Sequence, residues 1–313
     1  MTLTELKYIV TLAEEKHFGK AAEKCNVSQP TLSVAVKKLE DELGVALFER
    51  GKNQISVTET GQKVVAQSCK VLQQVEGIQD IVLAGKDPLA TPLKLGAIYT
   101  VGPYLFPHLV PELRRVAKKL SLYVEENYTS VLKDRLKQGK LDAIVVALPF
   151  SEPEVLTLPL YDEPFVVMLP SGHPLINNES LTADDLLSDN LLMLGPGHCF
   201  REQLLDSCPQ IEKALSSTRT DGAHWPVSNG KPELITEGSS LETIKQMVAT
   251  GFGISVLPLS AASPPTGMGD LVELRPFRPP VPYRTVAIAW RVTFPRTKAI
   301  DTLVLAAGQC RVV

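Results

Sequence analysis

The sequence predicts a mixed α+β protein: a small N-terminal helical domain, a long connecting helix and a larger C-terminal domain of alternating strands and helices. Three patterns support this division. Residues 1–57 show three helices followed by a short hairpin, and residues 58–88 form one helical pattern that ends at Gly-Lys-Asp-Pro. From Leu93 onward, short β-rich segments alternate with helical ones. The 313 residues are 44% hydrophobic, which is enough for more than one core.

The first region contains two helices joined by a tight turn, with one helix before them. Ser28 stands where a helix N-cap belongs, and Pro30 follows in the first turn, where proline is tolerated. The helix that they begin covers residues 29–43. Apolar faces toward a common core are expected at Leu6, Ile9, Val10 and Ala13 of the first helix and at Leu32, Val36, Leu39 and Leu43 of the third.

The outward face of the 29–43 helix suits the major groove of DNA. Its leading residues are short, uncharged or singly basic, and no acid occurs before Glu40. Residues 1–88 hold 11 basic and 12 acidic residues, so the argument depends on where charges lie and not on their sum. A plain three-helix bundle without a ligand remains the alternative. The candidate DNA contacts are Ser28, Gln29, Pro30, Thr31, Ser33, Val34 and Lys37, with Arg50 and Lys52 of the hairpin for phosphates.

The long helix carries an apolar seam at spacings of seven, four, three and four residues, formed by Val64, Val71, Val75, Ile78 and Val82. The seam either packs onto its own domain or pairs two copies of the chain. Pairing is the favoured interpretation, because a solitary helix of this length cannot bury the stripe on itself.

The C-terminal region begins with a βαβαβ pattern over residues 93–149, and a second such unit covers about 165–259. A strand at 286–291 returns near the end. This alternation predicts a parallel sheet covered by helices. Thr100 and Thr129 each follow a strand at the same expected edge of the sheet, so each is either an ordinary helix cap or a residue facing a cleft there.

The segment Gly195–Cys208 contains two of the five cysteines. Cys199 follows a Gly-Pro-Gly turn, begins an expected helix and is flanked by His198 and Arg201, a setting that favours thiolate. Cys208 shares an apolar helix face with Phe200 and Leu204. Nine helical residues separate the two thiols by about 13 Å, whereas a disulfide needs Cα atoms within about 7 Å. A disulfide would therefore require the helix to unwind.

Two alternatives compete with a redox role. The pair could consist of structural core thiols or form half of a metal site, with His224 as the nearest further ligand in sequence, although zinc spacing is absent. Cys69 and Cys310 receive no role, and no cofactor or metal is expected. The absence of a long apolar stretch and of a signal peptide predicts a cytoplasmic protein without a membrane contact.

Residues 21–50, AAEKCNVSQPTLSVAVKKLEDELGVALFER, closely resemble the signature of LysR-type transcriptional regulators. Cys25 stands where their pattern has leucine, and we interpret it as a small core residue. The resemblance implies a winged helix-turn-helix at 1–57, a linker helix at 58–88 that pairs two subunits, and a periplasmic-binding-protein-like effector domain at 89–313. It further implies dimers or tetramers on double-stranded operator DNA, and an interaction with RNA polymerase.

GHCFREQLLDSC, AIYTVGPYLFPHL and EGSSLETIKQMVATGFGISVLP resemble the hydrogen peroxide-sensing branch of this family. That resemblance implies that Cys199 is the peroxide-reacting thiol, that Cys208 resolves it into a reversible disulfide, and that Thr100, Thr129, His198, Arg201 and Arg284 shape a peroxide pocket. The effector domain would comprise subdomain I, about 89–163 and 269–313, and subdomain II, about 164–268. Residues 211–235 look longer than in some relatives.

The expected function is therefore a transcription regulator, not an enzyme, with hydrogen peroxide as its signal. A regulator that responds to a metabolite, with incidental cysteines, is one alternative. A thiol peroxidase or disulfide oxidoreductase is another, although the chain has no CxxC motif.

Overall fold

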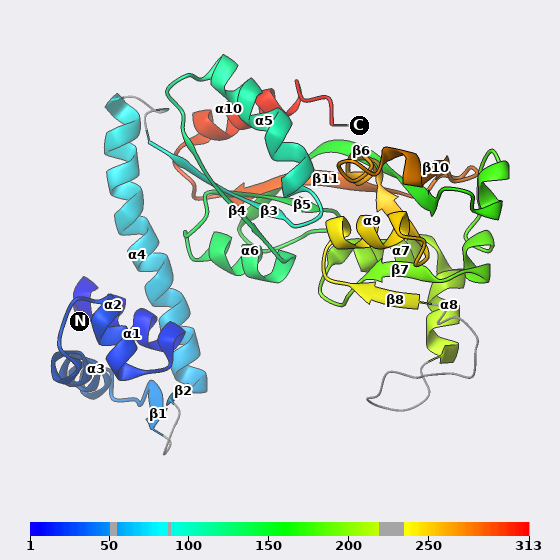
Figure 1. Ribbon diagram of the computed structural model, residues 1–313. Helices are drawn as coiled ribbons and strands as arrows, with labels where there is room; N and C mark the ends of the chain where they lie inside the picture. Colours follow the sequence, from blue (N-terminus) through cyan, green and yellow to red (C-terminus); the bar gives the residue numbers. More distant parts are fainter. Residues whose placement is uncertain (51–54, 87–88, 90, 219–234, 313) are drawn as a thin grey trace. The chain divides into compact units, whose positions relative to one another are not determined.

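The computed structural model describes residues 1–50, 55–86, 89, 91–218 and 235–312 (Figure 1). The chain divides into two compact units, Met1–Lys86 and Asp87–Val313. Among the described residues, none of the helices is long and apolar enough to cross a membrane. The finer domain and subdomain boundaries expected from the sequence stay predictions.

The first unit consists of three short helices, a two-stranded hairpin and a long helix, as predicted. Its elements are α1 (Leu3–Glu15), α2 (Phe18–Lys24), α3 (Gln29–Leu43), β1 (Phe48–Arg50), β2 (Ile55–Val57) and α4 (Glu59–Lys86). Strands β1 and β2 pair antiparallel. Leu32, Val36 and Leu39 are buried as expected, but the prediction for Leu43 is wrong, since it is 37% exposed. It occupies the last position of α3, beyond the packed part of the helix.

The seam of α4 divides into two halves with different surroundings. Val64 and Val71 pack against the core of the first unit. Ile78 and Val82 are 60% and 58% exposed, and Ile81 beside them is 61% exposed. The first half therefore follows the self-packing alternative, while the second half leaves an apolar face exposed on the single chain.

The second unit is built on a mixed sheet in the strand order β4-β3-β5-β11-β6-β9-β7-β8, with β10 beside β6. The elements in chain order are β3 (Leu93–Ile98), α5 (Gly102–Val116), β4 (Leu122–Asn127), α6 (Thr129–Lys137), β5 (Ala143–Ala147), β6 (Val155–Pro170), β7 (Leu191–Leu194), α7 (Cys199–Ser207), α8 (Pro209–Thr218), β8 (Ile235–Gly238), α9 (Leu241–Ala249), β9 (Ile254–Pro258), β10 (Val272–Pro276), β11 (Tyr283–Arg291) and α10 (Thr297–Ala307).

The prediction of a parallel sheet holds only for the two ends of this order. Strands β4, β3 and β5 are parallel to one another, as are β9, β7 and β8. Between them, β11 pairs antiparallel with β5 and β6, and β6 pairs antiparallel with β9 and β10. The sequence pattern identified these strands but not their direction. Alternation of strands and helices predicts parallel pairing between neighbouring units, but it does not show how a strand pairs with one that is distant in the sequence.

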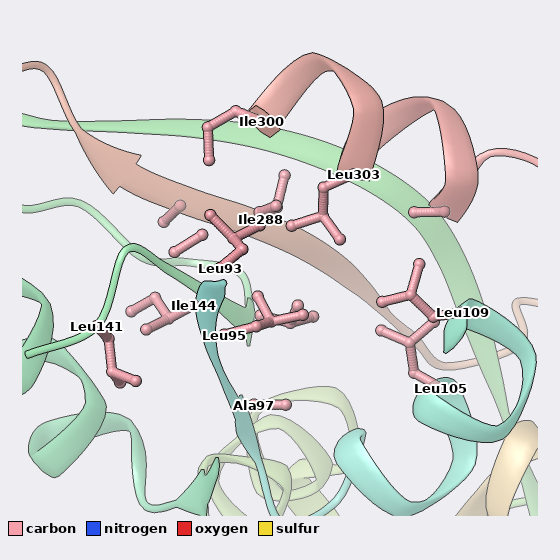
Figure 2. Packing of buried hydrophobic residues seen from close by; sticks show 14 of the residues in the cluster. Leu93, Leu95, Ala97, Leu105, Leu109, Leu141, Ile144, Ile288, Ile300 and Leu303 are labelled. Carbon is pink, nitrogen blue, oxygen red and sulfur yellow. The ribbon is translucent and has the colours of Figure 1, made fainter. Parts of the chain in front are cut away.

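Two hydrophobic cores flank the antiparallel strands. The first contains β3, β5 and β11 together with α5 and α10, and Figure 2 shows its leucine and isoleucine side chains meeting between these elements. The second is formed by β6, β7, β9, α7 and α9. Cys199 packs against the first core, whereas Cys208 is a member of the second. Residues nine apart in the sequence thus belong to different cores.

Candidate redox site and DNA-binding surface

The loop before α7 holds Cys199 at the first position of that helix, as predicted. Gly197 has φ +96°, a conformation that side-chain-bearing residues rarely adopt. A Cβ there would lie 3.5 Å from the ring of Tyr128. That distance is an ordinary contact, so the backbone conformation, and not a lack of space, favours glycine in the turn before Cys199.

Cys199 lines a small cavity where the loop meets the ends of β3 and β4. The space open to the centre of a water-sized molecule is about 10 Å³, roughly that of a single water. Its walls combine three segments that are distant in the sequence: Ile98–Thr100, Asn127–Thr129 and Gly197–Cys199. The cavity therefore admits one very small polar molecule beside the thiol.

The two threonines predicted for this edge both line the cavity, and neither is the N-cap of its helix. The caps of α5 and α6 are Val101 and Tyr128. The Thr129 hydroxyl oxygen is buried and, within the described part of the chain, has no hydrogen-bond partner. The Thr100 hydroxyl instead accepts a hydrogen bond from Arg284. One wall thus offers an unsatisfied hydroxyl and another a hydroxyl held by a cation.

Arg284 lies behind this wall and does not itself line the cavity. Its Nη1 and Nη2 atoms donate to the hydroxyl and the carbonyl of Thr100, each at 2.8 Å. Its Nε donates to Glu163 at 2.7 Å, and its guanidinium carbon lies 5.5 Å from the ring centre of Phe200, the residue after Cys199. Arg284 therefore contacts both the cavity wall and the helix that carries the thiol.

His198 lines the cavity, but Arg201 does not. The His198 ring packs against Tyr128 with centroids 4.8 Å apart, and burial lowers the pKa of the imidazole. Burial therefore favours the neutral imidazole of His198 over the cation that the sequence led us to expect beside Cys199. Arg201 points to the end of β7, where it donates to the Leu194 carbonyl and pairs with Glu237 at 2.9 Å.

Cys208 caps the C-terminal end of α7 and is only 3% exposed. It lies in the second core with Phe200 and Leu204, as the spacing predicted. Burial raises the pKa of its thiol to about 11. The pair is therefore asymmetric: one thiol lines a cavity and the other is buried and protonated.

Tyr99 and Tyr128 line the cavity and were not singled out from the sequence. Their rings meet edge to face with centroids 5.3 Å apart, and both lie near His198. A signal for them exists, because the dipeptide Tyr-Thr occurs at both strand ends, at 99–100 and 128–129. Asn127, which also lines the cavity, has no comparable signal.

The α3 helix presents its predicted DNA-contacting residues at the surface of the first unit. Ser28 caps it through Thr31, and Ser33 is half-buried, whereas Val34 is 68% exposed. Ser28, Gln29, Pro30, Thr31 and Lys37 are all exposed. The Arg50 side chain and the whole of Lys52 lie outside the described residues, as does most of the 211–235 segment.

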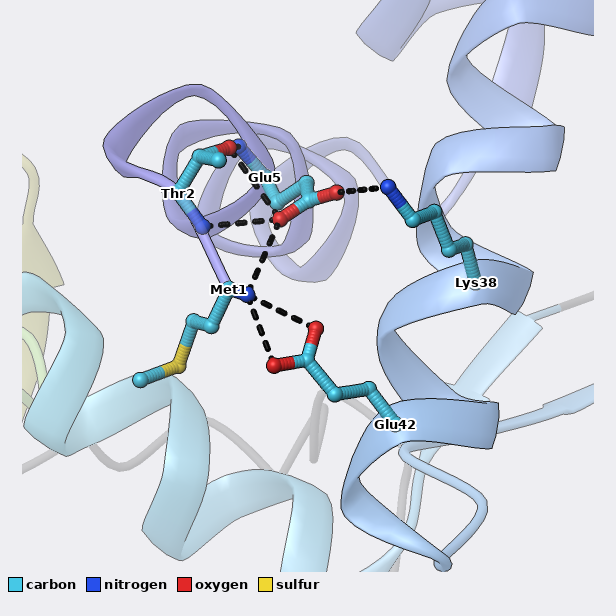
Figure 3. A network of polar contacts seen from close by, with 5 residues as sticks. All are labelled: Met1, Thr2, Glu5, Lys38 and Glu42. Atoms are coloured by element: carbon cyan, nitrogen blue, oxygen red, sulfur yellow. Dashed lines mark hydrogen bonds and ion pairs between the residues drawn. The ribbon is translucent and has the colours of Figure 1, made fainter.

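A polar network holds the start of α1 against the second half of α3 (Figure 3). The amino group of Met1 donates to both carboxylate oxygens of Glu42, at 2.8 and 2.7 Å. Glu5 closes a capping box with Thr2 and lies 3.8 Å from Lys38. These contacts hold the second half of α3 against the start of α1.

A helix-turn-helix unit joined by a long helix to a two-core α/β unit is the architecture of a class of bacterial transcription regulators. The chain belongs to the LysR family within that class. Residues 3–62 match the bacterial regulatory helix-turn-helix proteins of the lysR family, and residues 86–309 match the LysR substrate binding domain.

Relatives named OxyR are similar over almost the entire chain. The DNA-binding transcriptional dual regulator OxyR of Escherichia coli K12 is 37% identical over 303 residues, covering 97% of this chain and 93% of the relative. Full-length OxyR from Pseudomonas aeruginosa, solved as a cysteine-to-aspartate variant, is 54% identical with a TM-score of 0.78 and covers 100% of this chain and 96% of its own. A hydrogen peroxide-bound cysteine-to-serine variant of Corynebacterium glutamicum OxyR is 30% identical with a TM-score of 0.63, covering 98% and 92%. The resemblance to the OxyR branch is thereby confirmed.

Proposed function

We propose that this chain is a transcription regulator that binds DNA through α3 and senses hydrogen peroxide through Cys199. The observation that carries the proposal is the cavity beside Cys199, which has room for one molecule close to water in size and a buried, unsatisfied hydroxyl on Thr129. The small size of the cavity favours such a molecule over a larger metabolite. The names of the relatives support peroxide as the signal.

The first chemical step is the oxidation of Cys199. Its thiolate sulfur attacks one oxygen of peroxide, the O–O bond breaks, and the leaving hydroxide takes up a proton to become water. Sulfur is oxidised to sulfenic acid while peroxide is reduced. The hydroxyls of Thr100 and Thr129, which line the cavity with Cys199, would orient the two peroxide oxygens.

The second step joins Cys199 to Cys208. The Cys208 sulfur, once deprotonated, attacks the sulfenic sulfur, the S–O bond breaks, and water leaves as the disulfide forms. Along the intact α7 the two residues are about 13 Å apart, so the helix must unwind first. A dithiol reductant restores the two thiols. This unwinding supplies the structural change that a switch needs.

The DNA-binding part of the proposal assigns base contacts to the exposed leading residues of α3 and phosphate contacts to the hairpin. Ile78, Ile81 and Val82 of α4 support a homodimer or tetramer, because pairing two copies would cover their exposed side chains. The protein would act stoichiometrically rather than as an enzyme, and in the cytoplasm, where its operator lies.

The test compares Cys199→Ser and Cys208→Ser with Cys310→Ser in the full chain. Cys310 is a matched control, because it too is half-buried and packs against the first core. After brief peroxide treatment, mass spectrometry should find a 199–208 disulfide in the parent protein and in the control, but in neither of the other variants. Operator binding should change on oxidation in the parent protein and in Cys310→Ser only. A peroxide response that persists in Cys199→Ser would refute the proposal.

A further inference from the structure

Glu163 is a fully buried carboxylate that neither the sequence patterns nor the proposed chemistry uses. It lies on β6 directly opposite Arg284 of β11 in the antiparallel register. One carboxylate oxygen accepts from Arg284 Nε at 2.7 Å, and the other accepts from the backbone N–H of Ser260 at 2.9 Å. Both side chains of the ion pair are inaccessible to solvent.

These contacts determine which way the guanidinium faces. A guanidinium is planar, with Nε on one edge and the two Nη groups on the other. Since Glu163 holds the Nε edge, the Nη groups are directed at the hydroxyl and carbonyl of Thr100. The Ser260 contact prevents the carboxylate from rotating away, because it anchors the second oxygen to the backbone.

We propose that Glu163 is a positioning residue for the peroxide cavity, acting through Arg284 on Thr100. The inference rests on the proposed reaction of Cys199 with peroxide. Thr100 lines the cavity with Cys199, and Arg284 also packs over Phe200 at the start of the helix that carries the thiol. Loss of the carboxylate therefore lets the guanidinium of Arg284 move, and Thr100 in the cavity wall is then no longer held where peroxide must align.

Two substitutions of Glu163 distinguish the effect of its charge from the effect of its side-chain length. Glu163→Gln keeps the size but replaces one carboxylate oxygen with an NH2 donor. Because Arg284 and Ser260 donate to different oxygens of Glu163, one of the two then faces a donor in place of its acceptor. Glu163→Asp keeps the charge and is shorter by one methylene, so it cannot span both partners either. Glu163→Asp also guards against a loss of folding, because Arg284 keeps a counter-charge.

The measurement is the second-order rate constant of Cys199 with hydrogen peroxide, alongside its rate constant with iodoacetamide. Peroxide must be aligned in the cavity, whereas iodoacetamide reports whether the thiol is accessible and deprotonated. We expect Glu163→Gln and Glu163→Asp to slow the peroxide reaction by about 10- to 100-fold. The iodoacetamide rate constant should change by less than about threefold, since small misplacements affect alignment more than access.

A double-variant cycle tests whether the effect passes through Arg284. In an Arg284→Met background, adding Glu163→Gln should have no further effect on the peroxide rate. Asp142→Asn is the matched control. Its carboxyl is also buried, and it accepts from the Lys94 backbone N–H at the opposite end of β3, about 20 Å from Thr100 along the strand. Its peroxide rate constant should equal that of the parent.

The outcomes separate this inference from the proposed function. Parent-like peroxide rates in both Glu163 variants, equal slowing of both reagents, or an undiminished Glu163→Gln effect in the Arg284→Met background would each overturn the positioning role alone. A parent Cys199 that reacts with peroxide no faster than Cys310 would overturn the proposed function, and the positioning role with it.

Discussion

Truncating Leu204 to alanine should make the proposed disulfide more stable relative to the dithiol. Leu204 is buried in the second core beside Phe200 and Cys208. Removing a buried leucine side chain costs about 2–5 kcal/mol in the state where it is packed. If α7 unwinds to bring Cys208 to Cys199, Leu204 leaves the core, and the cost falls on the dithiol form only.

This difference converts directly into a redox potential. For a two-electron couple, about 30 mV corresponds to 1.4 kcal/mol, so Leu204→Ala should move the midpoint about 40–110 mV toward more negative values. The assay equilibrates the protein in thiol–disulfide buffers of stepped potential and measures the fraction of 199–208 disulfide by mass spectrometry.

Leu257→Ala is the control for this experiment. Leu257 is a fully buried leucine of the same core, but it lies on β9, which has no reason to unwind. It should lose a similar free energy of unfolding and keep the parent midpoint. A Leu204→Ala midpoint within about 15 mV of the parent, despite a clear loss of stability, would refute the unwinding argument, because Leu204 would then be packed in both redox states.

Two further predictions concern stability. Glu40→Ala should lower the free energy of unfolding of the first unit by about 1–3 kcal/mol, because Glu40 accepts from the backbone N–H groups of Leu47 and Phe48 at 2.7 and 3.1 Å. Chemical denaturation measures this loss. If Glu40→Gln lost as much stability as Glu40→Ala, the hydrogen-bond explanation would be contradicted. Burial raises the pKa of Cys208 from 9.0 to about 11, so folding favours the neutral thiol and this stabilisation disappears as pH rises from 9 to 11. Relative to Cys208→Ala, the parent should lose on the order of 2 kcal/mol of unfolding free energy over that pH range. Parallel pH profiles of stability for the two proteins would exclude this contribution of Cys208.

The first unit could be predicted from the sequence almost completely, because its signals are local. The cap at Ser28, the proline at Pro30 and the helical period of the leucines specify α3 without reference to distant residues. The prediction for Leu43 was wrong because helical periodicity shows which side of a helix is apolar, but not how far along the helix the neighbouring elements cover that side. The second half of α4 shows the same limit, since the stripe continues beyond the core that buries its beginning.

The candidate site was predictable only where its residues follow local features. Thr100 and Thr129 follow strands, so pattern alone placed these two at one edge of the sheet. Pattern also placed Cys199 at a helix start after a glycine turn, but only the family resemblance grouped it with the threonines. Glu163 carries no such signal: it is 121 positions from Arg284 in the sequence, and only the antiparallel register of β6 and β11 brings them together. The prediction of an entirely parallel sheet was wrong for the same reason, because β6 and β11 pair over a long distance in the sequence.

The location of the two cysteines in different cores determines which one must move. Cys199 is half-buried at a helix start, on the wall of a cavity, so its position is already compatible with the reaction. Cys208 is buried, and the next helix begins at Pro209, with Ile211 fully buried in the same core. Closing a gap of about 13 Å to about 7 Å from the Cys208 side therefore pulls on the anchor of α8. Oxidation would then be transmitted to the second core and to α8, while the first core stays packed.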